Sequence, residues 1–343
     1  MGDLMHALPA LTDACEKYPG IEFDWVVDEA FAEVPSWHPA VKNIYTSAHR
    51  RWKKSLISSW QNDEFSGFRN NLNANEYDVV IDAQNNVKSS FISFLRKGNV
   101  HGMDMHSVAE QPAFLAYKYT HSIDKNQHAI TRQRELFAKS LGYELPGTNV
   151  NYGIRSDAFI LPSIALESPF LFLVHNASWT TKLWNENYWF ELIGLAKEEN
   201  YNVVLPGGNS EELARAALIA SKHDNAIALP RMTLSELGGI ISKAEGAICC
   251  DTGLAHLTAI TGTPSVTMYG PTSVELIGTY GAGQQHLDAE NPLFPCSPCY
   301  KRICMYDGKS SAMSACMNSF KPAQIWDMLR TQIKKQTENR KKN

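Results

Sequence analysis

The sequence has no long hydrophobic run. Its longest clean apolar stretches, such as Phe170–Val174, have the length of a strand and are far too short to cross a bilayer. No charged segment followed by an apolar one opens the chain, so no secretory leader is expected. The seven cysteines, an odd number, then fit reduced thiols better than a set of disulfides. We therefore expect a cytoplasmic protein.

A strong net charge of one sign is also missing. The formal net charge of −4 argues against general nucleic-acid binding, so an anionic partner must be met by local basic patches. Two such patches occur, at residues 49–54 and 334–342. The sequence contains neither an internal repeat nor a low-complexity segment. Its 343 residues, 44% of them hydrophobic and 20% charged, predict a soluble globular protein of two domains.

Short apolar segments alternate with amphipathic ones, which is typical of α/β proteins with parallel sheets. The expected helices of the first half are residues 4–18, 88–97 and 127–141, and its expected strands are 23–27 and 79–81. The second half has expected strands at 169–175, 202–206, 225–229, 246–250 and 264–269. We predict two Rossmann-like, doubly wound domains facing across a cleft, at residues 1–155 and 156–325, followed by a helix end and basic tail at 326–343.

The first residues read as helix, whereas a doubly wound domain normally begins with a strand. Gly2 and Asp3 lead almost directly into the helical pattern. We therefore expect the first strand of this domain and its turn, about ten residues, to be missing ahead of Met1. Without that strand, the neighbouring strands would have unpaired edges.

The most informative motif is Asp251-Thr252-Gly253, between an apolar run and a helix-forming segment. A strand, a loop and a helix in this order point the backbone N–H groups of the helix N-terminus at the end of the strand, where anions bind. Thr252 and Gly253 allow phosphate oxygens to approach closely, and Asp251 can accept hydrogen bonds from sugar hydroxyls. By itself the motif would leave a plain strand-to-helix turn as the favoured interpretation.

Several segments together resemble the ADP-heptose:lipopolysaccharide heptosyltransferases, in particular those that join the first heptose to the Kdo of Kdo-lipid A. The matching segments are Gly2–Leu11, Asp24–Val27, Pro35–His38, Arg50–Trp52, Ile81–Gln84, Arg134–Tyr143 and Asp251–Gly253. The resemblance covers nearly the whole chain. It implies a GT-B fold, with the acceptor held mainly by the first domain and the sugar nucleotide by the second. It also implies inversion at the anomeric carbon without a metal.

The reaction implied by this resemblance needs a base for the acceptor hydroxyl and a group that stabilises the departing ADP. The resemblance assigns the base to Asp3 and the stabilising cation to Lys182. From spacing alone, Asp3 would more readily cap the first helix, and Lys182 could be an ordinary solvated lysine.

The resemblance also implies a set of residues for the donor, ADP-L-glycero-D-manno-heptose. They are Ser178, Lys182, Glu212, Met232, Asp251, Thr252, Gly253 and His256. Glu211 competes with Glu212 for the ribose, and either acid could simply complement a helix dipole. Met232 could instead fill the core, and His256 could be a core or capping histidine.

Cationic residues are expected to bind the carboxylates and phosphates of the acceptor, Kdo-lipid A. They are Arg50, Arg51, Lys53, Lys54, His128 and Arg132. The basic patch around Trp52 also predicts peripheral contact with the cytoplasmic face of the inner membrane. A solvated face with salt bridges is the alternative, and it is favoured more for Lys53, Lys54 and Arg134 than for Arg50 and Arg132. The segment 104–109 has no arginine where close relatives have one near Ala109, which leaves the details of acceptor recognition open.

Four cysteines near the end have the spacing C-x2-C-x4-C-x11-C, at Cys296, Cys299, Cys304 and Cys316. Four thiolates could hold zinc or an iron–sulfur cluster, but redox-active thiols or loop packing are favoured, and we expect no metal or other cofactor. The resulting hypothesis is a metal-independent, inverting heptosyltransferase. Two alternatives are a sugar-nucleotide epimerase of the same fold and a truncated, non-catalytic copy that binds nucleotide or lipid A.

Overall fold

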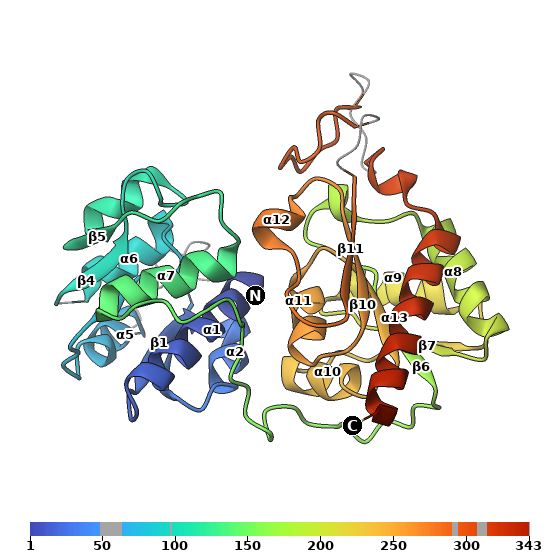
Figure 1. The fold of residues 1–343 in the computed structure, drawn as a ribbon, viewed down its shortest axis with the longest axis horizontal. Coiled ribbons are helices and arrows are strands. Elements are labelled where there is room, and N and C mark those ends of the chain that lie inside the picture. Colours follow the sequence, from blue (N-terminus) through green and yellow to red (C-terminus); the bar gives the residue numbers. More distant parts are fainter. Residues whose placement is uncertain (49–63, 97, 290–293, 307–313, 343) are drawn as a thin grey trace. The chain divides into compact units, whose positions relative to one another are not determined.

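The computed structural model of the chain (Figure 1) describes residues 1–48, 64–96, 98–289, 294–306 and 314–342. The chain divides into two compact units, one from Asp3 to Ala158 and one from Phe159 to Asn343. Among the described residues, no helix is both long and apolar enough to span a membrane.

The second unit is built on a six-stranded parallel sheet with the strand order β11-β10-β9-β6-β7-β8. Its strands are β6 (Phe170–Val174), β7 (Asn202–Leu205), β8 (Ala226–Ala228), β9 (Gly246–Cys250), β10 (Ser265–Tyr269) and β11 (Gln284–Asp288). The chain builds outward from β6 in one direction and then, from β9, in the other. Because the direction reverses between β6 and β9, the carboxyl ends of these two strands form the switch point where such sheets bind ligands. The five expected strands are confirmed, and β11 was not predicted.

Helices cover both faces of this sheet. The helical elements of this unit are η3 (Thr180–Lys182), α8 (Glu186–Glu198), α9 (Ser210–Ala220), α10 (Leu234–Ile241), α11 (Gly253–Ile260), α12 (Val274–Ile277), η5 (Met317–Ser319) and α13 (Pro322–Lys342). The spacing Thr233-x-x-Glu236, a sequence pattern typical of a capping box, forms one at the start of α10, in which the Thr233 hydroxyl accepts from the Glu236 N–H. The strands β6, β9 and β10 are buried along their whole length, as expected for a parallel sheet covered on both faces.

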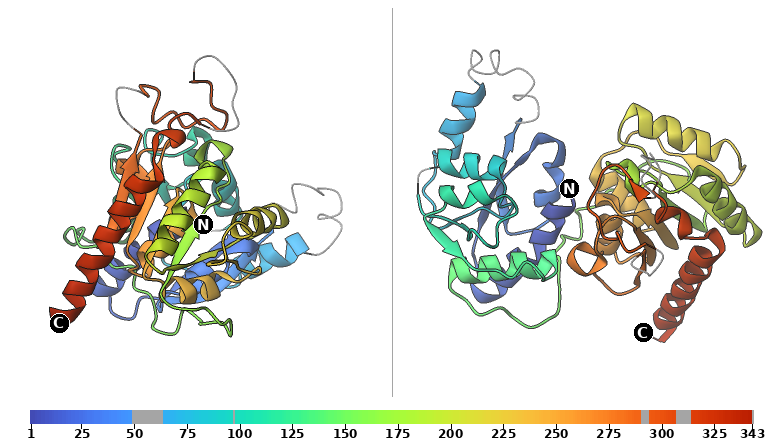
Figure 2. Two further views of the ribbon diagram at one scale, coloured as in Figure 1. Left: turned by 90° about the vertical axis from the view of Figure 1, so that its right-hand side faces the viewer. Right: turned by 90° about the horizontal axis from the view of Figure 1, so that it is seen from above.

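The last helix, α13, belongs to the core of the second unit (Figure 2). Its apolar side chains Ile325, Trp326, Leu329 and Ile333 are buried against the sheet and α8. These positions repeat at helical spacing, so one face of the helix is apolar. The stretch 326–342 therefore continues a packed helix that starts at Pro322.

The first unit contains two separate parallel sheets. Its elements are α1 (Gly2–Lys17), β1 (Phe23–Asp28), η1 (Glu29–Phe31), α2 (Glu33–Ser36), β2 (Val41–Ser47), α5 (Glu64–Leu72), β3 (Val80–Ile81), α6 (Val87–Leu95), β4 (Val100–Met103), η2 (Gln111–Ala116), β5 (Tyr119–His121) and α7 (Ala129–Leu141). One sheet pairs β1 with β2, and the other has the order β3-β4-β5. Within the described part of the chain, no strand joins β1 to β3. The expected helices and the strands β1 and β3 are confirmed, whereas β2, β4 and β5 were not predicted.

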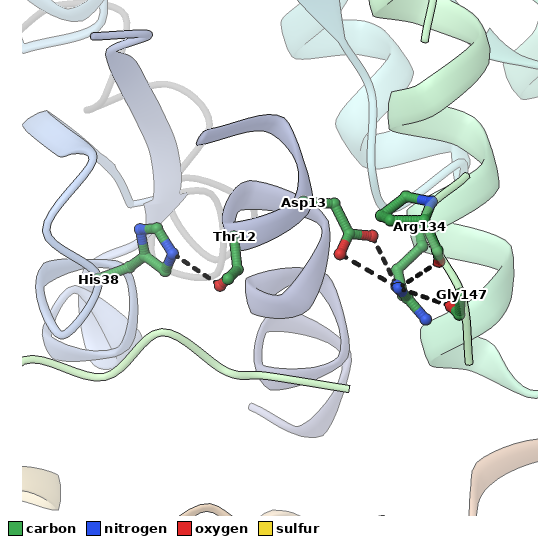
Figure 3. A network of polar contacts seen from close by, with 6 residues as sticks. Thr12, Asp13, His38, Arg134 and Gly147 are labelled. Carbon is green, nitrogen blue, oxygen red and sulfur yellow. Dashed lines mark hydrogen bonds and ion pairs between the residues drawn. The ribbon is translucent and has the colours of Figure 1, made fainter. Parts of the chain in front are cut away.

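A buried ion pair ties the first unit together (Figure 3). The Arg134 Nε lies 2.6 Å from an Asp13 carboxylate oxygen, and both side chains are more than nine-tenths buried. The Arg134 guanidinium also donates to the carbonyls of Pro146 and Gly147, at 3.0 and 3.2 Å. One side chain on α7 thus holds α1 and the segment after α7. The solvated alternative for Arg134 is wrong, because Asp13 supplies a charge partner inside the protein.

Replacing Arg134 by Met should lower the free energy of unfolding by about 3–5 kcal/mol, because it leaves the Asp13 charge buried without a partner. Urea denaturation of the full chain measures this change. The control is Arg155→Met in the exposed Arg155–Asp157 pair, which should cost no more than about 1 kcal/mol. A similar cost at the two sites would contradict the structural role of Arg134.

Candidate functional site

Three loops meet where the strands of the second sheet end near its switch point. They follow β6, β9 and β10. In the sheet, β9 lies between β6 and β10. In a parallel sheet all carboxyl ends lie on the same edge, so residues far apart in sequence are brought together there. The loop after β6 carries Lys182, the loop after β9 carries Asp251, and the loop after β10 carries Thr272.

Lys182, Asp251 and Thr272 form one polar cluster. The Lys182 Nζ lies 2.6 Å from the Asp251 Oδ2, and the two side chains are only 13% and 4% exposed. The Thr272 hydroxyl donates to the same carboxylate oxygen at 2.5 Å. Asp251 therefore orients Lys182 by a charge-assisted hydrogen bond and is itself held by Thr272. Lys182 is not a solvated lysine, and the surface alternative for it is wrong.

The helix α11 begins directly after Asp251, as expected from the motif. Its N-cap residue is Thr252, whose side chain makes no capping hydrogen bond to the helix. Thr252 and Gly253 are half-buried, and His256 in the first turn is 4% exposed. The positive end of the helix dipole therefore lies beside the Lys182–Asp251 pair, an arrangement that favours a bound anion.

The loop after β7 leads into α9 and carries the two candidate acids. The Glu212 carboxylate accepts from the Gly208 N–H at 2.8 Å, and the Glu212 N–H donates to the side chain of the N-cap residue Asn209. Glu212 thus shapes its own turn, whereas its competitor Glu211 is exposed. A side chain at Gly207 would collide with the backbone of Leu213, so this turn needs glycine.

The two remaining donor residues lie on loops after strands of the same sheet. Met232 follows β8 and is half-buried, and Ser178 follows β6 and is exposed. Neither is part of the fully buried core. All eight donor residues expected from the resemblance therefore lie on loops, or on first turns of helices, that follow strands of this sheet.

The cysteine-bearing segment 294–306 lies directly on the loops that carry Lys182 and Thr272. The hydroxyls of Thr180 and Thr181 donate to the carbonyls of Arg302 and Lys301, at 3.2 and 2.8 Å. No sequence pattern predicted this contact or a role for Thr272. For the segment, the only sequence signal was its cysteine spacing.

The four spaced cysteines differ in exposure. Cys296 is exposed, Cys299 and Cys304 are half-buried and Cys316 is buried. Burial raises the pKa of the Cys316 thiol, and the nearby Cys304 and Cys299 raise it further. The described residues contain no group of three or more histidine, cysteine or acidic side chains that could hold a metal ion.

In the first unit, Asp3 is exposed in the first turn of α1. The N-cap of this helix is Met1, so the capping position expected for Asp3 on spacing alone is wrong. Asp3 instead lies one residue inside the helix, where a carboxylate complements the positive end of the dipole.

Two of the expected acceptor residues lie at the start of α7. His128 is its N-cap and accepts from the Ile130 N–H through its Nδ1. The Arg132 guanidinium donates to the Ser107 carbonyl at 2.6 Å, and burial lowers the pKa of this side chain. Arg132 therefore anchors the turn after β4. The other four expected acceptor residues, Arg50, Arg51, Lys53 and Lys54, lie outside the described residues.

Residues 66–309 match the protein family Glycosyltransferase family 9 (heptosyltransferase). Lipopolysaccharide heptosyltransferase 1 of Pseudomonas aeruginosa is 40% identical over 89% of this chain and 85% of its own length. Lipopolysaccharide heptosyltransferase 1 of Salmonella typhimurium is 45% identical over 83% of this chain and 90% of its own length.

Solved structures agree with these sequence matches. Escherichia coli heptosyltransferase WaaC with ADP has a TM-score of 0.78 and 44% identity, over 83% of this chain and 89% of that one. The E. coli ADP-heptose lps heptosyltransferase II, at 15% identity and a TM-score of 0.70, shares the fold over 98% of this chain and 96% of that one. The expected GT-B fold and the resemblance stated from the sequence are confirmed. The chain belongs to glycosyltransferase family 9, the heptosyltransferases, and is a glycosyltransferase.

Proposed function

We propose that this enzyme transfers L-glycero-D-manno-heptose from ADP-heptose to the Kdo of Kdo-lipid A, with inversion and without a metal. The observation that carries the proposal is the Lys182–Asp251–Thr272 cluster beside the N-terminus of α11. Support also comes from relatives named lipopolysaccharide heptosyltransferase 1 and from an E. coli WaaC structure described as containing ADP-2-deoxy-2-fluoro heptose.

The diphosphate of the donor binds at the carboxyl edge of the second sheet. Backbone N–H groups at Thr252 and Gly253 donate to phosphate oxygens, and Lys182 supplies a cation held in place by Asp251. These groups stabilise the negative charge that develops on ADP as its bond to the sugar breaks. The remaining donor contacts come from Ser178, Glu212, Met232 and His256.

The acceptor hydroxyl attacks the anomeric carbon from the side opposite to ADP. The new C–O bond forms as the bond to the diphosphate breaks, and the bonding electrons leave with ADP. A single displacement of this kind inverts the configuration. The hydroxyl proton passes to the carboxylate of Asp3, which is exposed and therefore accessible to a substrate. Cationic side chains bind the anionic groups of the acceptor: Arg50, Arg51, Lys53, Lys54, His128 and Arg132.

A lipid-linked acceptor requires contact with the cytoplasmic face of the inner membrane, and an unusual helix supports that contact. On α6, Val87, Phe91 and Phe94 are 44%, 54% and 75% exposed, and their spacing places them on one face. Ser90 and Ser93 of the same helix are buried. This outward apolar face, with the exposed Lys88 beside it, suits the interface of an anionic bilayer.

The base is tested with Asp3→Asn. This variant should bind ADP like the wild type but release ADP from donor and acceptor at least about 100-fold more slowly, because proton removal is lost. The matched control is Glu16→Gln, which neutralises an exposed acid on the same helix. Unchanged turnover in Asp3→Asn would exclude Asp3 as the base.

The same assay separates the alternatives. Release of ADP, or rearrangement of the donor, without acceptor would favour an epimerase-like activity. Binding of ADP by the wild type without any turnover would support the non-catalytic alternative.

The donor cation is tested with Lys182→Met. Loss of a charge-assisted hydrogen bond should weaken ADP binding by roughly 10- to 150-fold, measured by titration calorimetry. Lys197→Met is the control, because Lys197 forms an exposed pair with Asp224 away from the site. If ADP bound equally well to the Lys182 variant and the wild type, Lys182 would have no part in the donor site.

The membrane contact is tested by replacing both Phe91 and Phe94 with Ser. We expect weaker co-sedimentation with phosphatidylglycerol vesicles, most clearly at high salt, where apolar contacts persist and electrostatic ones are screened. The control replaces Leu218 and Ile227, which are 47% and 41% exposed in the second unit. Vesicle binding that is identical in the wild type and the α6 variant would rule out this face.

A further inference from the structure

The donor site described so far has too little net positive charge to balance the diphosphate of the donor. Lys182 is the cation nearest Asp251, and the two form a buried pair at 2.6 Å whose charges cancel. The diphosphate of a sugar nucleotide carries two negative charges near neutral pH, one on each phosphate, and the ADP that is released gains further negative charge because the second ionisation of its terminal phosphate has a pKa near 6. Without a metal, the protein must supply a further positive charge.

Arg215 of α9 also lies near this edge but is already paired. Its Nε lies 3.3 Å from the Glu186 carboxylate, and its Nη2 donates to the Trp184 carbonyl. Its charge is therefore balanced within the protein in the same way as that of Lys182. The required cation has to come from another element.

Arg302, on the segment 294–306, meets this requirement. Its guanidinium carbon lies 5.4 Å from the centre of the Trp179 ring, and the Lys182 Nζ lies 4.8 Å from the same ring. Arg302 is exposed, and no carboxylate of the described residues is within ion-pair distance of it. Two cations thus lie near the ring of Trp179, and among the described residues only Lys182 has a carboxylate partner.

Backbone contacts hold Arg302 in this place. The Arg302 carbonyl accepts from the Thr180 hydroxyl, which lies two residues before Lys182. The Tyr300 N–H donates to the Pro271 carbonyl at 2.8 Å, next to Thr272. The segment is therefore attached to the loop after β6 and to the loop after β10, which together hold the Lys182–Asp251 pair.

We propose that Arg302 binds the diphosphate of the nucleotide donor beside Lys182. This assignment rests on the proposed function and adds to it a residue from the cysteine-bearing segment. A guanidinium can donate two parallel hydrogen bonds to phosphate oxygens, and the face of Trp179 holds it by a cation–π contact. The segment 294–306 thus forms one wall of the donor site.

The test compares Arg302→Gln, Arg302→Lys and Lys301→Gln in the full chain. Titration calorimetry gives the affinity for ADP, and ligand-detected NMR gives the affinity for adenosine, which has no phosphate. Arg302→Gln should weaken ADP binding by about tenfold or more and leave adenosine binding unchanged. Arg302→Lys should bind ADP with intermediate affinity, because it keeps the charge but loses the second hydrogen bond. Lys301→Gln, which removes an adjacent exposed charge, should stay within about twofold of the wild type.

Three results would overturn the assignment. Unchanged ADP affinity in Arg302→Gln would show that the guanidinium does not reach the diphosphate. Equal weakening for ADP and adenosine would show that Arg302 only holds the segment in place. Equal weakening in Lys301→Gln would show a general effect of charge. A wild-type protein that fails to bind ADP would instead overturn the proposed function itself, and this assignment with it.

Discussion

The buried pair between Lys182 and Asp251 is the interaction on which the candidate site depends. It joins the loops after β6 and β9, which are adjacent in the sheet on either side of the switch point. Breaking a buried ion pair leaves an uncompensated charge, so each partner restricts where the other can lie. Thr272 extends the constraint to the loop after β10. Three loops far apart in sequence thus hold one arrangement beside the N-terminus of α11.

This constraint also explains why the site needs positive charge from elements outside the sheet. A pair that neutralises itself orients a lysine well but contributes little net charge to an incoming diphosphate. The helix N-terminus supplies partial positive charge, and the segment 294–306 brings Arg302 to the ring of Trp179. Orientation and net charge are therefore provided by different parts of the second unit.

The first unit shows the same principle in a structural role. Asp13 and Arg134 are 121 residues apart, and their buried pair fixes α1 against α7. Its two sheets are small and separate, so helix contacts of this kind contribute to holding the unit together. The helix α6 departs from the usual pattern, with serines inside and phenylalanines outside, which is the arrangement expected of a face that meets an apolar partner.

The local pattern of the sequence determined most of the second unit, including five of its six strands, the capping box at Thr233 and the start of α11 after Asp251. These features depend on neighbouring residues, so periodicity and capping chemistry reveal them. Only the tertiary structure decided that Arg134 is buried, that Lys182 is paired and that the segment 294–306 covers its loop. Each of these contacts joins residues about 70 to 120 positions apart. A local sequence pattern cannot predict such partners, because only folding brings them within hydrogen-bond distance.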